Sequence, residues 1–348
     1  MNEPFDFSRL WLLKKLEKRG TSFGLQEVLT RPMSPFWRAV SSYISVHESG
    51  VRTYFAQAYT DTGRLSGVIQ VRECSLRPEA EIVYIAPSLS ANSETRSLWS
   101  QLLAQVCRQA GEQGVQRVFV GSEWGSEETN LLQEEGFSAY AREQILRLAE
   151  PAAGQRRGPL SGLRRLEDGD EMRLMDLYLA VTPRRVQWAE GQSFPLSWSA
   201  SVARGNLRGE EAYILEEEES KAISAFLRLS PGKAGHWLEV VVAPDSRAEV
   251  DVLIEFGLER MSGWPRRPVY AAVREYQGGV LPALLAKGFE PYAHQAVLVK
   301  HTAVWMKDPF QVRVSGVEKR VEPSTPTVTL ANGELMLEKQ SQPITNLR

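Results

Sequence analysis

Two stretches of the sequence have the residue types and the spacing to hold a charged ligand next to a reactive side chain. Each is an apolar run rich in β-branched residues that ends at Ala-Pro and leads through a polar loop into an amphipathic helix, at 81–106 and at 236–261. Proline has no amide to donate, so Pro87 and Pro244 mark where strand pairing stops. Free backbone amides and the positive end of a helix dipole gather at such strand-to-helix turns. Each turn can therefore stabilise a negative group, and a glutamate, Glu81 or Glu239, stands on the strand before it.

The elements that position these stretches occur twice in the same order. The first round predicts strands at 53–59, 65–73 and 81–86, a helix at 95–110, a strand at 115–122, a helix at 127–137 and a strand at 141–148. The second predicts a strand at 163–166, helices at 172–181 and near 195–204, strands at 212–215, 222–229 and 237–242, a helix at 247–262, a strand at 268–273, a helix at 278–289 and a strand at 294–300. Asp168 or Asp170 caps the helix at 172–181. Both rounds end their last helix at Gly-Phe, which indicates a duplicated unit.

The flanking segments suggest how the chain divides. Residues 8–20 read as a helix capped by Ser8, and Pro35 opens a second helix through Ile44. The small, Pro- and Gly-containing stretch 150–162 reads as a linker. We therefore expect a first domain at 1–149, a second at 163–306, and a polar C-terminal tail at 307–348 that is mobile.

Composition excludes several classes of function. The chain has 348 residues, 43% of them apolar, and a net charge of -2, which leaves no basic excess for gripping nucleic acid. Lys14, Lys15, Lys18 and Arg19 could dock on an acidic membrane surface, but basic residues are also favourable at the C-terminal end of a helix, and we prefer that second interpretation. No apolar stretch is long enough for a membrane span, so we expect no membrane partner. Cys74 and Cys107 read as reduced core thiols, and no Cys/His spacing suggests a metal site. We expect a cytoplasmic protein without a metal.

The element order, the strand ending in Ala-Pro and the helix ending in Gly-Phe together resemble the GNAT superfamily of acyl-CoA-dependent N-acetyltransferases. The resemblance covers roughly 53–148 and 163–301. It implies an α/β (α+β) fold of two tandem GNAT-like domains, each a mixed, mostly antiparallel sheet with a splayed pair of parallel strands and flanking helices. It also implies acetyl-CoA as co-substrate and a primary amine of a small molecule or protein as acceptor.

In such folds the pantetheine arm lies between the splayed strands, and the pyrophosphate lies on the loop that opens the next helix. The resemblance assigns cofactor contacts to Val241, Val242, Ala243, Arg247 and Ala248 in the second round, and to Ile85, Ala86, Thr95, Arg96 and Ser97 in the first. Both loops depart from the family pattern because they lack its glycines, whose absence of a side chain lets the backbone approach phosphate. Glu249 and Asp251 also place negative charge at the second loop.

The same resemblance suggests which residues move protons. Glu239 and Glu81 are candidates for the base that deprotonates the amine, and Tyr84 could donate to the leaving thiolate. In this family the general acid is often a tyrosine four residues before the Gly of Gly-Phe. This chain has Leu132 and Leu284 at those positions.

Five further residues are weaker candidates. His236 and His294 could act as bases, although histidines at strand ends are more often structural. Tyr292 is a further candidate donor, and Trp188 and Trp198 fall in the segment that covers the acceptor in such folds.

Three functional hypotheses follow. The first is an acyl-CoA-dependent N-acetyltransferase in which one gap is catalytic and the other has become structural. The alternative is a non-catalytic tandem GNAT-fold protein that binds or scaffolds, which the altered loops favour. The third is a pseudo-symmetric binder with a peptide groove between its halves, lined by Trp188 and Trp198. We adopt the first because backbone amides supply most contacts to this cofactor.

Overall fold

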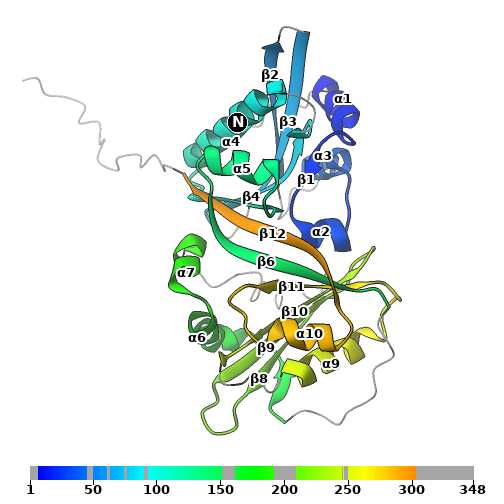
Figure 1. Ribbon diagram of the computed structural model, residues 1–348, viewed down its shortest axis with the longest axis vertical. Helices are drawn as coiled ribbons and strands as arrows, with labels where there is room; N and C mark the ends of the chain where they lie inside the picture. Colours follow the sequence, from blue (N-terminus) through cyan, green and yellow to red (C-terminus); the bar gives the residue numbers. More distant parts are fainter. Residues whose placement is uncertain are drawn as a thin grey trace, which may run out of the picture. The chain divides into compact units, whose positions relative to one another are not determined.

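A computed structural model describes residues 7–44, 50–60, 63–73, 77–89, 93–150, 161–191, 209–244, 246 and 250–302. Twelve strands of this part of the chain form one mixed sheet (Figure 1). The strands are β1 (Thr21–Ser22), β2 (Val51–Thr60), β3 (Gly63–Glu73), β4 (Glu79–Ala86), β5 (Arg117–Glu123), β6 (Ser138–Leu148), β7 (Leu163–Arg165), β8 (Glu211–Glu216), β9 (Ile223–Ser230), β10 (His236–Val242), β11 (Val269–Arg274) and β12 (Glu290–His301). The helices are α1 (Phe7–Leu16), α2 (Leu25–Thr30), α3 (Pro35–Ile44), α4 (Ser93–Glu112), α5 (Glu127–Glu134), the 3-10 turn η2 (Asp168–Asp170), α6 (Glu171–Val181), α7 (Arg184–Glu190), α9 (Val250–Met261) and α10 (Val280–Ala286).

The predicted order of strands and helices is confirmed in both rounds, and with it the α/β fold class. Asp170 stands at the N-cap position of α6, but its side chain makes no capping hydrogen bond to that helix. Its carboxylate instead accepts a hydrogen bond from the Glu167 backbone amide at 2.8 Å, as part of a capping box on the preceding turn η2. Three short elements, β1, α2 and α7, were not predicted from the sequence. The expected helix near 195–204, most of the linker at 150–162 and the tail at 307–348 lie outside the described residues. The domain boundaries stay a prediction, since residues 1–305 form one compact unit.

The two halves meet through an exchange of their last strands. The sheet order is β2-β3-β4-β5-β12-β6-β11-β10-β9-β8-β7, so β5 of the first half pairs with β12 of the second. In the same way β11 of the second half pairs with β6 of the first. The strands β6 and β12 also pair with each other and run side by side through the middle of the sheet (Figure 1). Each half therefore completes its sheet with a strand from the other.

The central pair is internally symmetric. The spacing that separates the two Gly-Phe pairs also separates Glu143 from Gln295, which are direct register partners. Gln295 Nε2 donates to Glu143 Oε2 at 2.6 Å. The same spacing relates Tyr140 and Tyr292, the two residues skipped where the register shifts. A two-fold pseudo-axis therefore passes between Glu143 and Gln295.

Helices cover both faces of the sheet in each half. On one face, α4 and α5 pack on the first half in a core that also contains Leu298 of β12, and α9 and α10 pack on the second half with Leu146 of β6. On the other face, α1 and α3 cover the first half and α6 covers the second. Each main core thus contains a side chain supplied by the other half. None of the helices described within 7–302 is long and apolar enough to cross a bilayer.

Candidate functional site

Both predicted pairs of parallel strands diverge. The strands β4 and β5 pair over three positions and separate after Glu81 and Phe119, while β4 runs on to Ala86. The strands β10 and β11 also pair over three positions and separate after Leu238 and Ala271, while β10 runs on to Val242. We call the space beyond the last paired positions the first wedge and the second wedge, respectively.

The first wedge is filled by the chain's own N-terminal segment. Strand β1 pairs antiparallel with β4, joining Thr21 to Ile85 and Ser22 to Tyr84. Because β3 already pairs with the opposite edge of these β4 residues, β1 must lie on the edge that faces β5. The Phe23 amide extends this pairing with a hydrogen bond to the Val83 carbonyl at 3.0 Å. A peptide segment therefore takes the hydrogen-bonding position that a cofactor arm would need.

Side chains seal the filled wedge. Phe23 is 3% exposed and lies in the core beside Trp99, with ring centroids 6.2 Å apart. Gly20 leaves no room for a side chain, because an added Cβ would stand 2.4 Å from the Ile85 carbonyl oxygen. The Tyr84 hydroxyl donates to the Leu16 carbonyl at 2.7 Å, and burial raises the pKa of Tyr84 well above its usual value. Tyr84 thus holds α1 in place and keeps its proton, so we leave it and Ile85 out of the proposed site.

The second wedge has a different edge. Among the described residues, no strand pairs with β10 beyond Leu238 on the side of β11. Backbone groups alternate between the two neighbours of a strand; the His236 amide points to the β11 side and the Ala243 amide to β9. It follows that the amides of Val240 and Val242 face the wedge. This edge can pair with an extended ligand as an added strand would.

Glu239 stands at the narrow end of the second wedge, as the first β10 residue after the last paired position. Its carboxylate forms an ion pair with Arg228 of β9 at 2.6 Å. The neighbouring residues on its face, Trp237 and Val241, pack in the clusters formed with α2 and α6, respectively. In the first half, Glu81 still belongs to the paired region and lies 3.2 Å from Arg72. Only Glu239 of the two lies within a wedge.

The helix-opening loops are only partly described. In the first half, Thr95 is buried and Ser97 exposed, while Arg96 forms ion pairs with Glu134 and Glu127 of α5. The sole cation of that loop region is thus already engaged within the protein. In the second half, Val241, Val242 and Ala243 line up along the end of β10, whereas Arg247 and Ala248 lie outside the described residues.

The other residues singled out from the sequence have ordinary surroundings. Leu132 and Leu284 are fully buried in the two cores, so neither half has the family's acid at that position. His236 is buried, with Nε2 2.8 Å from the Pro265 carbonyl oxygen. Trp188 is exposed on α7, and Tyr292 is exposed with its ring 5.5 Å from that of Tyr270. Trp198 lies outside the described residues.

A polar cluster that sequence reasoning missed surrounds Arg274 at the end of β11. Its guanidinium donates to Glu143 of β6 at 2.8 Å and to Glu190 of α7 at 2.6 Å. Glu190 also accepts from the Tyr178 hydroxyl at 2.7 Å. Burial would lower the pKa of Arg274, but Glu190, Tyr276 and Glu143 together raise it well above its ordinary value. The cluster fixes α7 against the rim of the second wedge. The sequence gives no indication of this polar cluster, because its residues are far apart in the chain.

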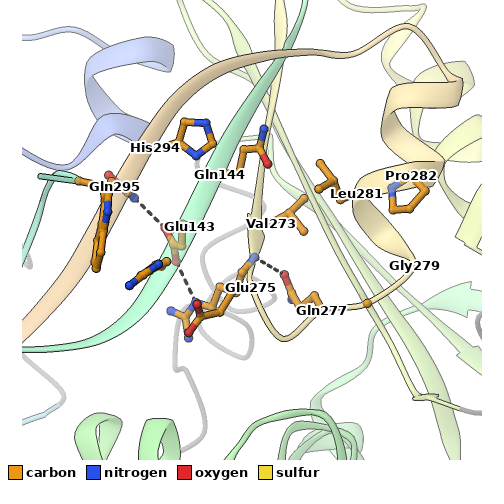
Figure 2. A pocket seen from close by; sticks show the side chains of 14 residues that line it. Glu143, Gln144, Val273, Glu275, Gln277, Gly279, Leu281, Pro282, His294 and Gln295 are labelled. Carbon is orange, nitrogen blue, oxygen red and sulfur yellow. Dashed lines mark hydrogen bonds and ion pairs between the residues drawn. The ribbon is translucent and has the colours of Figure 1, made fainter.

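A pocket of about 560 Å³ adjoins this cluster at the pseudo-axis (Figure 2). Its walls come from the end of β11 and the loop after it, the middle of β6, the start of α10, β12 and Trp124. Figure 2 shows Gln295 directed at Glu143 on one side and Leu281 and Pro282 on the other. Arg142 covers the Trp124 ring, with its guanidinium carbon 3.6 Å from the ring centroid. The pocket is therefore lined by polar side chains on one side and by apolar side chains on the other. Within the described residues, no group of His, Cys, Asp or Glu could hold a metal ion.

Comparison with known proteins supports the fold. No family model matches the sequence, and no curated protein matches it. A solved tandem GNAT protein from the clavulanic acid biosynthesis pathway superposes over 84% of this chain and 94% of its own, with a TM-score of 0.50 and 13% identity. A GCN5-related N-acetyltransferase from Sphaerobacter thermophilus covers 78% of this chain and 86% of its own, with a TM-score of 0.47 and 12% identity. Two rounds of the same elements, two diverging parallel pairs and the first of these matches lead to one conclusion: the chain has the fold of the tandem GNAT proteins.

Proposed function

We propose that the protein is an acyl-CoA-dependent N-acetyltransferase whose chemistry takes place in the second wedge. The observation that carries this proposal is the edge of β10 at Val240 and Val242, along which the described residues place no strand, with Glu239 at the narrow end of the wedge. Acetyl-CoA fits this edge, because amides that face an unpaired side can bond to a pantetheine arm as they would to a strand. The first wedge offers no such edge, since β1 occupies it.

Each residue of the second wedge has a distinct task in this proposal. The amides of Val240 and Val242 bind and orient the cofactor arm, and Val241 and Ala243 shape its channel. Arg247 and Ala248, at the loop implied by the resemblance, meet the pyrophosphate. Bound acetyl-CoA would supply the acetyl group in activated form, as a thioester.

Glu239 acts as the general base. Its carboxylate takes a proton from the incoming ammonium, directly or through one water, which makes the amine a nucleophile. Arg228 holds that carboxylate from the neighbouring strand at 2.6 Å and fixes its position at the narrow end. The fully buried Leu284 cannot donate a proton to the departing thiolate, so that proton must come from solvent or the acceptor.

The test compares Glu239→Gln with the matched variant Glu81→Gln. Release of free CoA thiol is followed with acetyl-CoA and a panel of amines: a polyamine, amino acids, an aminoglycoside and a peptide with a free N-terminus. Loss of a general base should lower the transfer rate by roughly 10²-fold or more in Glu239→Gln, with acetyl-CoA affinity retained. Glu81→Gln should keep the wild-type rate. Equal rates in wild type and Glu239→Gln would remove Glu239 from the mechanism, and failure of the wild type to bind acetyl-CoA would refute the function.

A further inference from the structure

Exposed aromatic and basic side chains gather on α1 and α3, on the outer side of these helices. Trp11 on α1 is 68% exposed and Trp37 on α3 is 60% exposed, which places two indoles largely in solvent. The opposite side of α1 is buried through Leu13 and Leu16 in the core under the first half. The helix therefore presents Trp11 outward because its apolar side already packs on the sheet.

Basic side chains link the aromatic residues into one surface. Lys14 Nζ lies 5.2 Å from the Phe36 ring centroid, and Phe36 packs edge-on against Trp37 at 5.5 Å. Lys15 Nζ lies 5.7 Å from the Trp11 ring centroid. Helices α1 and α3 lie side by side in Figure 1, in agreement with these contacts. We define the aromatic-basic surface by Trp11, Lys14, Lys15, Phe36 and Trp37, together with the exposed Lys18 that follows α1. Lys14 also pairs with Glu17 at 2.6 Å, so Lys15 and Lys18 carry the remaining positive charge.

Stabilisation of the C-terminal end of α1 explains the lysines of this surface but not its tryptophans. Basic residues in the last turn of α1 favour the helix dipole, as expected from the sequence. That effect needs no tryptophan, and a large exposed ring is unfavourable unless something covers it. The other exposed tryptophans in the part of the chain that the structure describes are placed differently. Trp124 is covered by Arg142, and Trp188 lies on α7, where neighbouring residues are engaged in ion pairs with Glu275 and Arg274.

The residue types on this surface indicate what kind of partner would bind to it. Indole rings prefer the boundary between lipid headgroups and acyl chains, while lysines are attracted to anionic phosphates and can extend their ammonium groups to them. We propose that the aromatic-basic surface docks the protein on the surface of a bilayer that contains anionic lipid. This revises the expectation of no membrane partner, and the contact is peripheral.

Flotation with lipid vesicles tests the proposal. The full chain is mixed with vesicles of phosphatidylcholine alone or of phosphatidylcholine with phosphatidylserine, at low and high ionic strength. Binding should require phosphatidylserine and weaken with salt, because surface charge attraction is screened. The variants Trp11→Ser/Trp37→Ser and Lys15→Glu/Lys18→Glu should each lower partitioning by about tenfold or more. The matched control Trp188→Ser, an indole of similar exposure in the second half, should bind like wild type.

Three results would overturn the proposal. One is the absence of flotation with phosphatidylserine at low salt. Another is equal flotation of the wild type and Trp11→Ser/Trp37→Ser. The third is tight binding of a DNA oligonucleotide that depends on the lysines but not on the tryptophans, which would make the surface a general polyanion site. Circular dichroism and thermal unfolding of each variant confirm that the fold is retained, since all substituted side chains are exposed.

Discussion

The two wedges share a strand arrangement and differ in what lies between the strands. Both parallel pairs separate after three paired positions. In the first, β1 pairs with β4 and Phe23 fills the core behind it. In the second, the described residues place no strand along the edge of β10 beyond Leu238. The two wedges thus differ by a segment of four residues, 20–23, which fills the first wedge and has no counterpart among the described residues of the second.

The difference teaches how a ligand site can become part of a core. An extended peptide offers a strand edge the same hydrogen-bonding groups that a pantetheine arm offers. A peptide belonging to the chain is always present, so its hydrogen bonds and its buried Phe23 contribute to folding. The following predictions test this comparison, in order of decreasing expected effect.

The largest effect is expected from Phe23→Ala in the filled wedge. Removing a 3% exposed aromatic ring from the core should lower the free energy of unfolding by about 3–5 kcal/mol. Chemical denaturation of the two proteins measures this difference. The control is Trp188→Ala, in which a 66% exposed ring is removed, and it should change stability by less than about 0.5 kcal/mol. A small effect of Phe23→Ala would mean that the segment only rests against the wedge.

Because the last strands are exchanged, a substitution in the sequence of one half should destabilise the core of the other half. Leu298 belongs to the second half in sequence but lies in the first core, and Leu146 shows the reverse. Each change to alanine should cost about 2–5 kcal/mol. Hydrogen exchange then locates the damage: Leu298→Ala should first reduce protection of α4, and Leu146→Ala that of α9. Loss of protection confined to the half that carries the substitution in sequence would contradict the exchange.

A smaller effect is expected from His236, at the end of the second parallel pair where β10 and β11 are still paired. His236 begins β10 there, and burial lowers its pKa below the ordinary 6.5. As pH falls through 6.5, the unfolded chain takes up a proton that the folded chain resists, so stability should decrease. One group contributes at most about 1.4 kcal/mol per pH unit. Between pH 7.5 and 5.5, the unfolding free energy of His236→Gln should depend less on pH than that of the wild type, with a difference in slope of up to about 1.4 kcal/mol per pH unit. An unchanged slope in His236→Gln would show that other titratable groups cause the pH dependence.

Local pattern was enough to predict most of the elements, because strand and helix periodicity are properties of neighbouring residues. The hairpin of β2 and β3, the strand β10 and the position of Asp170 at the start of α6 all follow from such signals. Partner choice is not local: nothing in the sequence of β12 distinguishes β5 from β11 as its neighbour. The two residues of β1 are too few to show periodicity, so the filling of the first wedge was not predicted.

The candidate site divides in the same way. Glu239 could be selected from its place on a strand that ends at Ala-Pro, and the structure locates it inside a wedge. Tyr84 has the same kind of position in the sequence, yet its hydroxyl is held by Leu16, far earlier in the chain. Arg274 joins Glu143 and Glu190 across long sequence separations, which no spacing rule anticipates.

Calorimetric titration with acetyl-CoA tests the central claim most directly, because it counts working wedges. We expect one molecule bound per chain. Arg247→Glu, at the loop that the resemblance assigns to the pyrophosphate, should weaken binding by about tenfold or more, while the matched Arg96→Glu in the first half should bind like wild type. Two molecules per chain, or loss of binding in Arg96→Glu alone, would contradict the account of a filled first wedge. No binding at all would contradict the acetyltransferase itself.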